Sequence, residues 1–145
     1  MHRVLKTLRQ ICLGLALSGA HAAHAADLPD IEAGRIRTVI EGQLAAFAVD
    51  DGARALSYAA PELRRRFRNA RQFLNMIRQH YPVVYRPVSV RFMPPDAESD
   101  GVYQAVEMSD TTGVVWIAIY RLLRLAPGEW RIVGCRLVTG DGRAT

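Results

Sequence analysis

The sequence contains few of the residues that usually cross-link a chain or bind metals: two cysteines and four histidines among 145 residues. If residues 1–25 are a removable leader, as argued below, only Cys135 and His80 remain. A single cysteine excludes an intramolecular disulfide, and no H-x-x-x-H or C-x-x-C spacing indicates a metal site. We therefore predict a domain that is stabilised by packing, with no metal and no other cofactor.

Lysine is nearly absent, since Lys6 is the only one. Of the 19 lysines and arginines, three lie within residues 1–25, which leaves 16 arginines against 14 acidic residues. A nucleic-acid-binding surface needs a marked excess of cations on one face, which this near-balance does not provide. We therefore expect no nucleic-acid partner.

The chain also lacks an apolar run of the roughly 20 residues that cross a membrane. Its N-terminus instead fits a secretory signal peptide: a short apolar core, residues 11–17, follows Arg3, Lys6 and Arg9. Ala23-His24-Ala25 fits the small-x-small cleavage rule, so cleavage after Ala25 or Ala26 is expected. A membrane anchor is the weaker alternative. The sequence thus predicts a periplasmic or secreted protein with no transmembrane segment after cleavage, and one domain over residues 26–145.

The first half of that domain is helical by pattern. Apolar residues at three- and four-residue spacing predict helices over about 31–49, 53–59 and 70–80, with a helical turn beginning at Pro61. Asp51 and Asn69 are the expected N-caps. Phe73, Met76, Ile77 and His80 form the expected inner face of the third long segment. Residues 82–87 are expected to be extended, because they are bounded by prolines.

The second half has the alternation of strands. We predict strands over 88–92, 102–108, 114–125 and 129–139, and a loop over Asp96–Gly101. Tight turns join the last three, so they pair in antiparallel fashion. Helices followed by strands indicate an α+β fold, with N-terminal helices packed on a curved antiparallel sheet of about four strands.

The segment Val114–Tyr120 has no charge on either face. Val115, Ile117 and Ile119 point one way, while Trp116, Ala118 and Tyr120 point the other. An antiparallel strand normally presents polar residues to water on one side. We expect helices to cover one face and favour a second subunit, in a homodimer through the sheet, over the other. A loop or terminal segment of the same chain is the alternative.

A resemblance to a known family rests on a set of residues along the domain: Ile40-x-x-Gln43-Leu44-x-Ala46-Phe47, Asp50-Asp51, Ala59-Ala60-Pro61, Phe67, Phe73-x-x-Met76-Ile77-x-x-x-Tyr81-Pro82-Val83-Val84-Tyr85-Arg86-Pro87, Gln104-x-Val106, Asp110-x-x-Gly113, Tyr120 and Trp130-Arg131-Ile132-x-Gly134. Over about residues 36–138 the chain resembles the domain of unknown function 4864 family. That family is similar to the nuclear transport factor 2-like superfamily, a cone-shaped α+β fold shared with ketosteroid isomerases. The resemblance implies a fold and no catalytic residues. The family often has Ser where this chain has Ala60.

Enzymes of the cone fold place an acid or base in a pocket between helices and sheet, which by analogy makes several residues candidates. The pocket candidates are Tyr58, His80, Tyr81, Trp116 and Tyr120. Asp50 and Asp51 are more simply helix-end residues, and His80 is more simply a partner of the helix dipole or a partly buried core residue. Cys135 alternates with Val133 and Leu137, which indicates a buried, unreactive thiol.

The arginine run suggests one further surface. At helical spacing Arg64, Arg68 and Arg71 share a face that could hold an anion, a lipid headgroup or an acidic partner, although a solvated face is the simpler interpretation. No set of catalytic residues is visible. The leading hypothesis is therefore non-enzymatic binding of a small apolar ligand or a protein partner. The alternatives are a small isomerase- or hydratase-like enzyme that uses a pocket carboxylate or His80 with a tyrosine, and an accessory protein that docks on the cell envelope through the arginines.

Overall fold

A computed structural model describes residues 27–141, and the predicted signal peptide lies outside the described residues. Five helical segments come first: α1 (Asp30–Ala48), α2 (Gly52–Ser57), α3 (Pro61–Arg64), α4 (Ala70–His80) and α5 (Pro82–Tyr85). Five strands follow: β1 (Ser89–Phe92), β2 (Asp96–Glu98), β3 (Gly101–Ser109), β4 (Val115–Ala126) and β5 (Glu129–Thr139). The predicted α+β class is confirmed, and within the described residues no helix is long and apolar enough to span a membrane.

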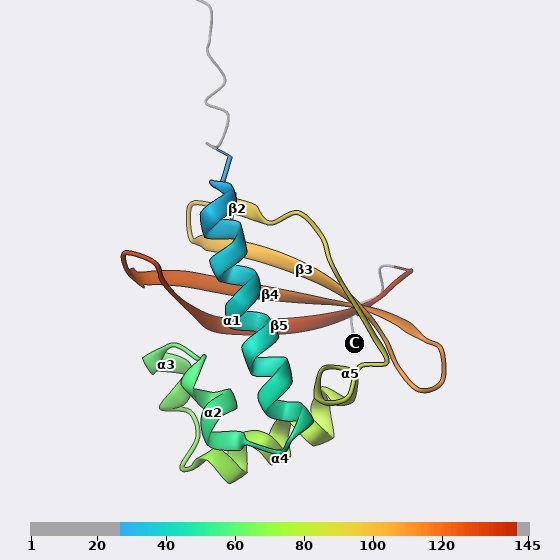
Figure 1. The fold of residues 1–145 in the computed structure, drawn as a ribbon. Helices are drawn as coiled ribbons and strands as arrows, with labels where there is room; N and C mark the ends of the chain where they lie inside the picture. Colours follow the sequence, from blue (N-terminus) through green and yellow to red (C-terminus); the bar gives the residue numbers. More distant parts are fainter. Residues whose placement is uncertain (1–26, 142–145) are drawn as a thin grey trace, which may run out of the picture.

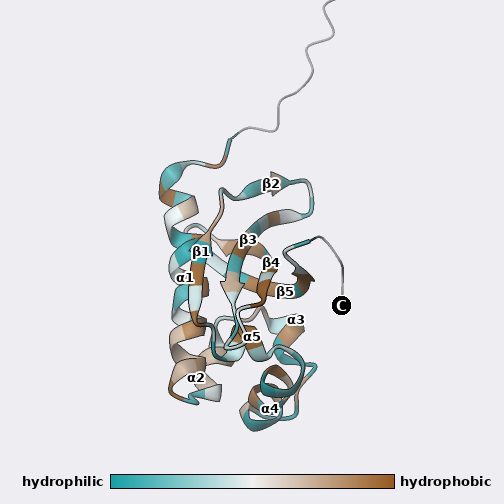
Figure 2. Cartoon of the chain, turned by 90° about the vertical axis from the view of Figure 1, so that its right-hand side faces the viewer, coloured by the Kyte–Doolittle hydropathy of each residue, from teal (hydrophilic) through white to brown (hydrophobic). Residues whose placement is uncertain are grey.

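The sheet is antiparallel throughout, with the order β1-β3-β4-β5, and β2 pairs with the same strand, β3, as β1 does. Helix α1 lies across the strands, while α2, α3 and α4 gather beyond one end of it (Figure 1). Figure 2 shows α1 on one side of the strands, with hydrophobic residues along β4 and β5. The helices therefore cover one face of the sheet, which we call the inner face.

Burial identifies the inner face residue by residue. Ala118 and Tyr120 are fully buried, whereas their neighbours Ile117 and Ile119 are half-buried and Val115 is exposed. The predicted separation of the two faces of β4 is thus confirmed. The core lies between the inner face and the apolar stripe of α1, where Ile36, Ile40 and Phe47 are completely buried.

The predicted helix starts are confirmed by their caps. The Asp51 carboxylate accepts a hydrogen bond from the Arg54 backbone N–H at 3.0 Å, and the Asn69 side chain accepts one from Gln72 N–H at 2.9 Å. Each cap satisfies one of the N–H groups that the first turn of a helix leaves unpaired. These two side chains therefore fix where α2 and α4 begin.

Two local predictions were wrong. Residues 82–85 form a single helical turn, α5, because Pro82 takes its first position, where its fixed φ suits a helix and no N–H is needed. Residues 96–98 form the short strand β2, which pairs with β3 at Val102 and Tyr103, so the sheet gains a fifth strand. The conformation of such a short segment depends on pairing with a neighbouring strand, so its own sequence pattern does not indicate a strand.

Candidate functional site

A pocket of about 200 Å³ lies between α4 and the inner face of the sheet, and several of its lining side chains are buried. We call it the inner pocket. Phe73, Met76 and Ile77 of α4 form one wall. They lie on one face because positions three and four apart in a helix are neighbours. The opposite wall comes from Tyr120 on β4 and residues 132–135 of β5, and Phe67 contributes from the segment between α3 and α4.

A bulge in β5 shapes the strand wall of this pocket. Leu122 pairs with Ile132 but Arg121 pairs with Gly134, so Val133 is an extra residue between them. Such an insertion bends a strand and changes which side chains face each side. As a result Ile132 and Cys135, an odd number of positions apart, both line the inner pocket.

Tyr120 is the unusual polar group of the inner pocket. Its side chain is 1% exposed, and its hydroxyl makes no hydrogen bond to any part of the chain that the structure describes. Buried hydroxyls are nearly always hydrogen-bonded, because losing water without a replacement partner is unfavourable. Burial, and secondarily the nearby Cys135, raises the pKa of Tyr120 far above its usual value. The group is therefore a neutral donor and acceptor with its capacity unused.

Three other uncharged polar side chains line the pocket, those of Tyr81, Cys135 and Gln43. The Tyr81 hydroxyl donates to the Cys135 backbone carbonyl at 3.3 Å, and burial raises the Tyr81 pKa. Desolvation also raises the pKa of the Cys135 thiol to about 12, although the residue is half-buried and not fully buried as the sequence predicted. The Gln43 side-chain amide donates to Ala55 O at 3.2 Å and so connects α1 to α2. At neutral pH none of these groups is ionised.

A second depression of about 540 Å³, the outer groove, lies between the C-terminal end of α4 and the β3–β4 turn. His80 and Trp116 line it together with Asp110. The Trp116 indole N–H donates to Asp110 at 2.9 Å, and the same carboxylate accepts from Thr112 and from the Val114 backbone. These hydrogen bonds, that of Thr112 first, lower the Asp110 pKa to about 2. Asp110 thus stabilises the β3–β4 turn through these hydrogen bonds, and its side chain is a negatively charged carboxylate at neutral pH.

Asp50 was expected to act as a helix-end residue, and its role is wider than that. Its backbone closes α1 with a positive φ of 55°, while Asp50 N–H and Asp51 N–H donate to Phe47 O and Ala46 O at 3.1 and 2.9 Å. This is the hydrogen-bonding pattern of a Schellman motif, which places a residue in the left-handed region just after the helix. Asp and Asn adopt that conformation more readily than most other side chains.

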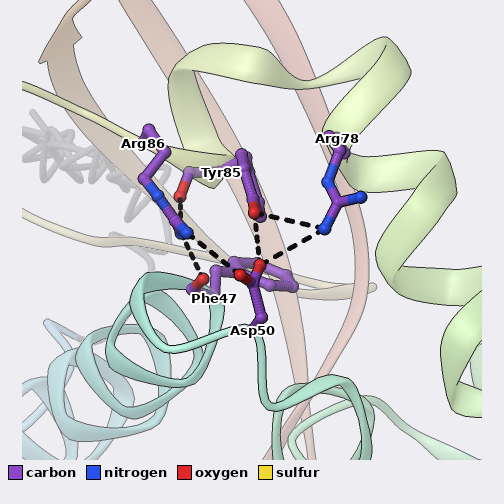
Figure 3. A network of polar contacts seen from close by, with 5 residues as sticks. All are labelled: Phe47, Asp50, Arg78, Tyr85 and Arg86. Carbon is purple, nitrogen blue, oxygen red and sulfur yellow. Dashed lines mark hydrogen bonds and ion pairs between the residues drawn. The ribbon is translucent and has the colours of Figure 1, made fainter.

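The Asp50 side chain joins three elements (Figure 3). It accepts a hydrogen bond from the Tyr85 hydroxyl, and Arg78 and Arg86 each approach it at 3.4 Å. The Arg86 guanidinium also lies 4.0 Å from the centre of the Tyr85 ring, a cation–π contact. The Tyr85 hydrogen bond, followed by the two arginines, lowers the Asp50 pKa. The Tyr81–Pro87 run therefore serves to dock α5 onto the end of α1.

The five pocket candidates from the sequence separate into three places. Tyr81 and Tyr120 line the inner pocket, whereas His80 and Trp116 line the outer groove. Tyr58 lines neither. Its side chain lies against Gly42 of α1, and its backbone carbonyl accepts from Ile132 N–H at 2.9 Å. His80 is exposed, so its predicted place on the inner face of α4 was wrong, and Leu74 is buried there instead.

The predicted arginine face requires a helix that the chain does not form. Arg64 ends α3, Arg68 lies between helices, and Arg71 is in α4, which begins only after the Asn69 cap. All three side chains are exposed. The three arginines therefore do not share one helical face, and whether they bind an anion stays a prediction.

Of the residues that line the inner pocket, sequence reasoning named only Tyr81 and Tyr120 as pocket residues. It missed Gln43 and Arg66 among others, and it named Phe73 only as part of the core. The signal that was available is the i, i+3, i+4 spacing of Phe73, Met76 and Ile77, which places them on one side. What faces that side depends on the bulge in β5, which no pattern indicated.

The inner pocket can bind but has little means to transfer protons. Its lining side chains carry hydroxyl, thiol, amide and guanidinium groups, and none of those within residues 27–141 carries a carboxylate or imidazole. Over the same residues no three His, Cys, Asp or Glu side chains gather as metal ligands would. The arrangement is that of an apolar pocket with a few neutral hydrogen-bonding groups, as small-molecule sites commonly are.

Fold and site together define a small α+β domain with a mainly apolar pocket between its helices and an open antiparallel sheet. The chain belongs to the family described as Domain of unknown function (DUF4864), whose model matches residues 29–145. Comparisons with curated proteins and with solved structures find no match.

Proposed function

We propose that this protein binds a small, mainly apolar molecule in the inner pocket and does not transform it. The observation that carries the proposal is the Tyr120 hydroxyl, which is buried without a partner in a side chain that lines the inner pocket. Leaving such a group unsatisfied costs about 1–3 kcal/mol. A bound molecule with one hydrogen-bonding oxygen would remove that cost and gain from contact with Phe67, Phe73 and Ile77.

The volume limits the size of the molecule. An apolar cavity of about 150 Å³ is known to accommodate benzene, and the inner pocket has about 200 Å³. It therefore suits a single six-membered ring with one or two substituents, or a branched chain of similar size. Pockets for drug-sized ligands start at about 300 Å³.

Binding is favoured over catalysis because of the chemistry of the lining. An isomerase or hydratase needs a group that accepts a proton near neutral pH. The Tyr81 and Tyr120 hydroxyls and the Cys135 thiol all have raised pKa values, so they hold their protons at that pH. Tyrosine hydroxyls of this kind serve well as hydrogen-bond donors to a carbonyl or hydroxyl oxygen.

We propose further that the domain acts outside the cytoplasm and is related to the nuclear transport factor 2-like superfamily. The first proposal is supported by the signal-peptide pattern of residues 1–25, and the second by helices that pack against one face of an antiparallel sheet. Cell fractionation with intact-mass measurement tests the first. A mature chain that begins at Ala26 or Asp27 in the periplasm is expected, and full-length chain in the cytoplasm would contradict it.

A second copy of the chain is the proposed partner for the outer face of the sheet. Ile117 and Ile119 of the interior strand β4 lie on this face, and both are only half-buried. Arg91 and Glu107, which pair at 2.6 Å, lie on the same face. An interface between identical copies must be self-complementary, and a surface with an apolar centre and both signs of charge meets that requirement.

The binding proposal is tested with cyclohexanone and phenol as probes, by ligand-observed NMR on the mature protein. Both are expected to bind, and Cys135→Leu, which places a larger side chain in the pocket wall, is expected to abolish binding. Cys135→Ala is the matched control and should retain it. Absence of binding by either probe, or equal binding to the Leu variant when that variant is folded, would overturn the proposal. Native mass spectrometry of protein from its own source would reveal a retained ligand.

A further inference from the structure

The inner pocket has two chemically different ends. The Tyr120 hydroxyl is fully buried, whereas the Arg66 side chain, which also lines the pocket, is exposed. Arg66 lies between α3 and α4, where its backbone N–H donates to Leu63 O at 3.2 Å. The pocket thus runs from a neutral hydroxyl inside to a guanidinium at the mouth.

The charge at the mouth is not neutralised by the rest of the domain. Arg66 and its neighbours Arg64, Arg65 and Arg68 are all exposed, and within residues 27–141 none of their guanidinium groups pairs with a carboxylate. By contrast, most arginines elsewhere in the described domain lie within 4 Å of a carboxylate, as Arg91 does with Glu107. The mouth therefore attracts an anion, and arginine presents a fork that matches a carboxylate.

The inside of the pocket has the opposite preference. Within residues 27–141 no cationic side chain is hydrogen-bonded to the Tyr120 hydroxyl, and an ionised group buried without a partner is strongly unfavourable. An oxygen that enters the pocket must therefore be neutral, such as a hydroxyl, a ketone or an ether. The apolar walls between the two ends, among them Phe67 and Ile77, favour a ring or an aliphatic body.

We infer that the ligand is an organic monocarboxylate whose apolar body carries a neutral oxygen at the end opposite to the carboxylate. The neutral oxygen bonds to the Tyr120 hydroxyl, the body fills the pocket, and the carboxylate pairs with Arg66. This inference rests on the proposed function, because it names the chemical class that the inner pocket takes.

Three probes with the same ring separate the contributions of the two ends. 4-Hydroxybenzoate has both groups, phenol has only the inner oxygen, and benzoate has only the carboxylate. Isothermal titration on the mature protein is expected to rank 4-hydroxybenzoate as the tightest binder. Arg66→Gln is expected to raise the Kd of the two carboxylates about two- to tenfold, as for a partly exposed charged pair, and to leave phenol unchanged. Arg65→Gln is the matched control, because Arg65 is exposed but does not line the pocket.

Tyr120→Phe tests the inner end. It is expected to raise the Kd of 4-hydroxybenzoate and phenol about three- to tenfold, the value of one net hydrogen bond, and to leave benzoate unchanged. If phenol binds but Arg66→Gln weakens 4-hydroxybenzoate no more than Arg65→Gln does, the inference is wrong while the proposed function stands. If Tyr120→Phe weakens all three probes equally, the orientation is wrong. If no probe binds, cyclohexanone included, both are wrong.

Discussion

At the scale of single residues, Tyr120 combines two properties that rarely occur together, complete burial and an unused hydroxyl. The energetic consequence can be measured without any ligand. Tyr120→Phe removes a polar group that has lost its contact with water, so the free energy of unfolding is expected to stay the same or rise by up to about 1–3 kcal/mol. Urea denaturation of the mature protein measures it.

Tyr81→Phe is the matched control for this prediction. The Tyr81 hydroxyl has a partner, the Cys135 carbonyl at 3.3 Å, so its loss is expected to lower stability by about 0.5–1.5 kcal/mol. A clear loss of stability in Tyr120→Phe as well would show that its hydroxyl is satisfied in solution, and the basis of the binding proposal would be gone.

The negative charge of the Asp110 carboxylate stabilises the β3–β4 turn, because the carboxylate accepts several hydrogen bonds there. Hydrogen bonds from Thr112, Trp116 and Val114 lower its pKa to about 2, from an ordinary value of 3.8. A carboxyl whose pKa is lower in the folded state contributes stability above its unfolded pKa, and that contribution disappears as the pH falls through the folded pKa. Asp110→Asn should therefore be less stable than the wild type at pH 7, and the difference should shrink between about pH 4 and pH 2.

The measurement is chemical denaturation of both proteins at several pH values. The Asp50, Glu32 and Glu107 carboxyls also have lowered pKa values, and they are present in both proteins, so the difference isolates Asp110. A difference that stays constant down to pH 2 would show that shape, rather than charge, accounts for the effect of the substitution.

At the scale of elements, α1 has two interior glycines whose surroundings differ. A Cβ at Gly34 would meet nothing within 4 Å, whereas one at Gly42 would lie 2.4 Å from the Tyr58 hydroxyl oxygen. Gly34→Ala is therefore expected to stabilise the protein by about 0.5–1 kcal/mol through helix propensity. Gly42→Ala is expected to destabilise it by about 1–3 kcal/mol, because the Tyr58 ring must move.

Thermal or urea unfolding of the two variants checks this, and each variant is the control for the other because both replace glycine in one helix. Equal stabilisation by both would mean that Tyr58 does not pack on α1. The contact also explains why Tyr58 does not line the inner pocket, since its ring is held against the outer side of α1.

Also at this scale, the run Tyr81–Pro87, part of the pattern on which the family resemblance rests, is explained by the docking of α5. The turn α5 brings Tyr85 and Arg86 to the Asp50 side chain at the end of α1 (Figure 3). Segments that are 35 residues apart along the chain thus meet through one carboxylate. The network ties the helical layer together beside the outer groove, which Tyr85 and Arg86 line.

At the scale of the whole molecule, the open face of the sheet is the surface on which we expect a second copy of the chain to bind. Two rows of neighbouring residues cross the centre of this face from β3 through β4 to β5. One row is Glu107, Ile117 and Val138, and the other is Ala105, Ile119 and Arg136. If a second copy covers this face, the mature protein should have twice the chain mass by light scattering. Ile119→Arg should convert it to a monomer by burying a charge without a partner.

Val88→Arg is the control for the dimer prediction. Val88 is 65% exposed and directly precedes the edge strand β1, so it does not lie at the centre of the face. The substitution should leave the mass unchanged. A wild-type protein that is monomeric at tens of micromolar would contradict the dimer and leave the inner-pocket proposals untouched.

Much of the fold could be predicted from local signals. Asp51 and Asn69 fixed two helix starts, and turn residues between alternating segments gave β3, β4 and β5. The failures were short segments, α5 and β2, in which four and three residues follow their tertiary neighbours. His80 was misplaced because it is the last residue of α4 and is exposed although Ile77, three positions before it, is buried. The helical period alone does not reveal where the packing of a helix ends.

The candidate site was predictable in part. Tyr120 and Tyr81, two of the five candidates, line the inner pocket, and the inward direction of Tyr120 follows from strand alternation. Arg66 was not identified, because its place at the mouth depends on α3 ending at Arg64.

The sequence by itself determined the α+β class, the caps, the two faces of β4 and the absence of an intramolecular disulfide in the predicted mature chain, since each follows from local propensity, alternation or residue counts. Only the tertiary structure decided that Tyr120 lacks a partner, that Asp50 joins α1 to α4 and α5, and that Arg66 opens onto the same pocket as Tyr120. Those facts depend on which side chains from distant segments come within hydrogen-bonding reach, and the β5 bulge and the packing of α4 set those distances.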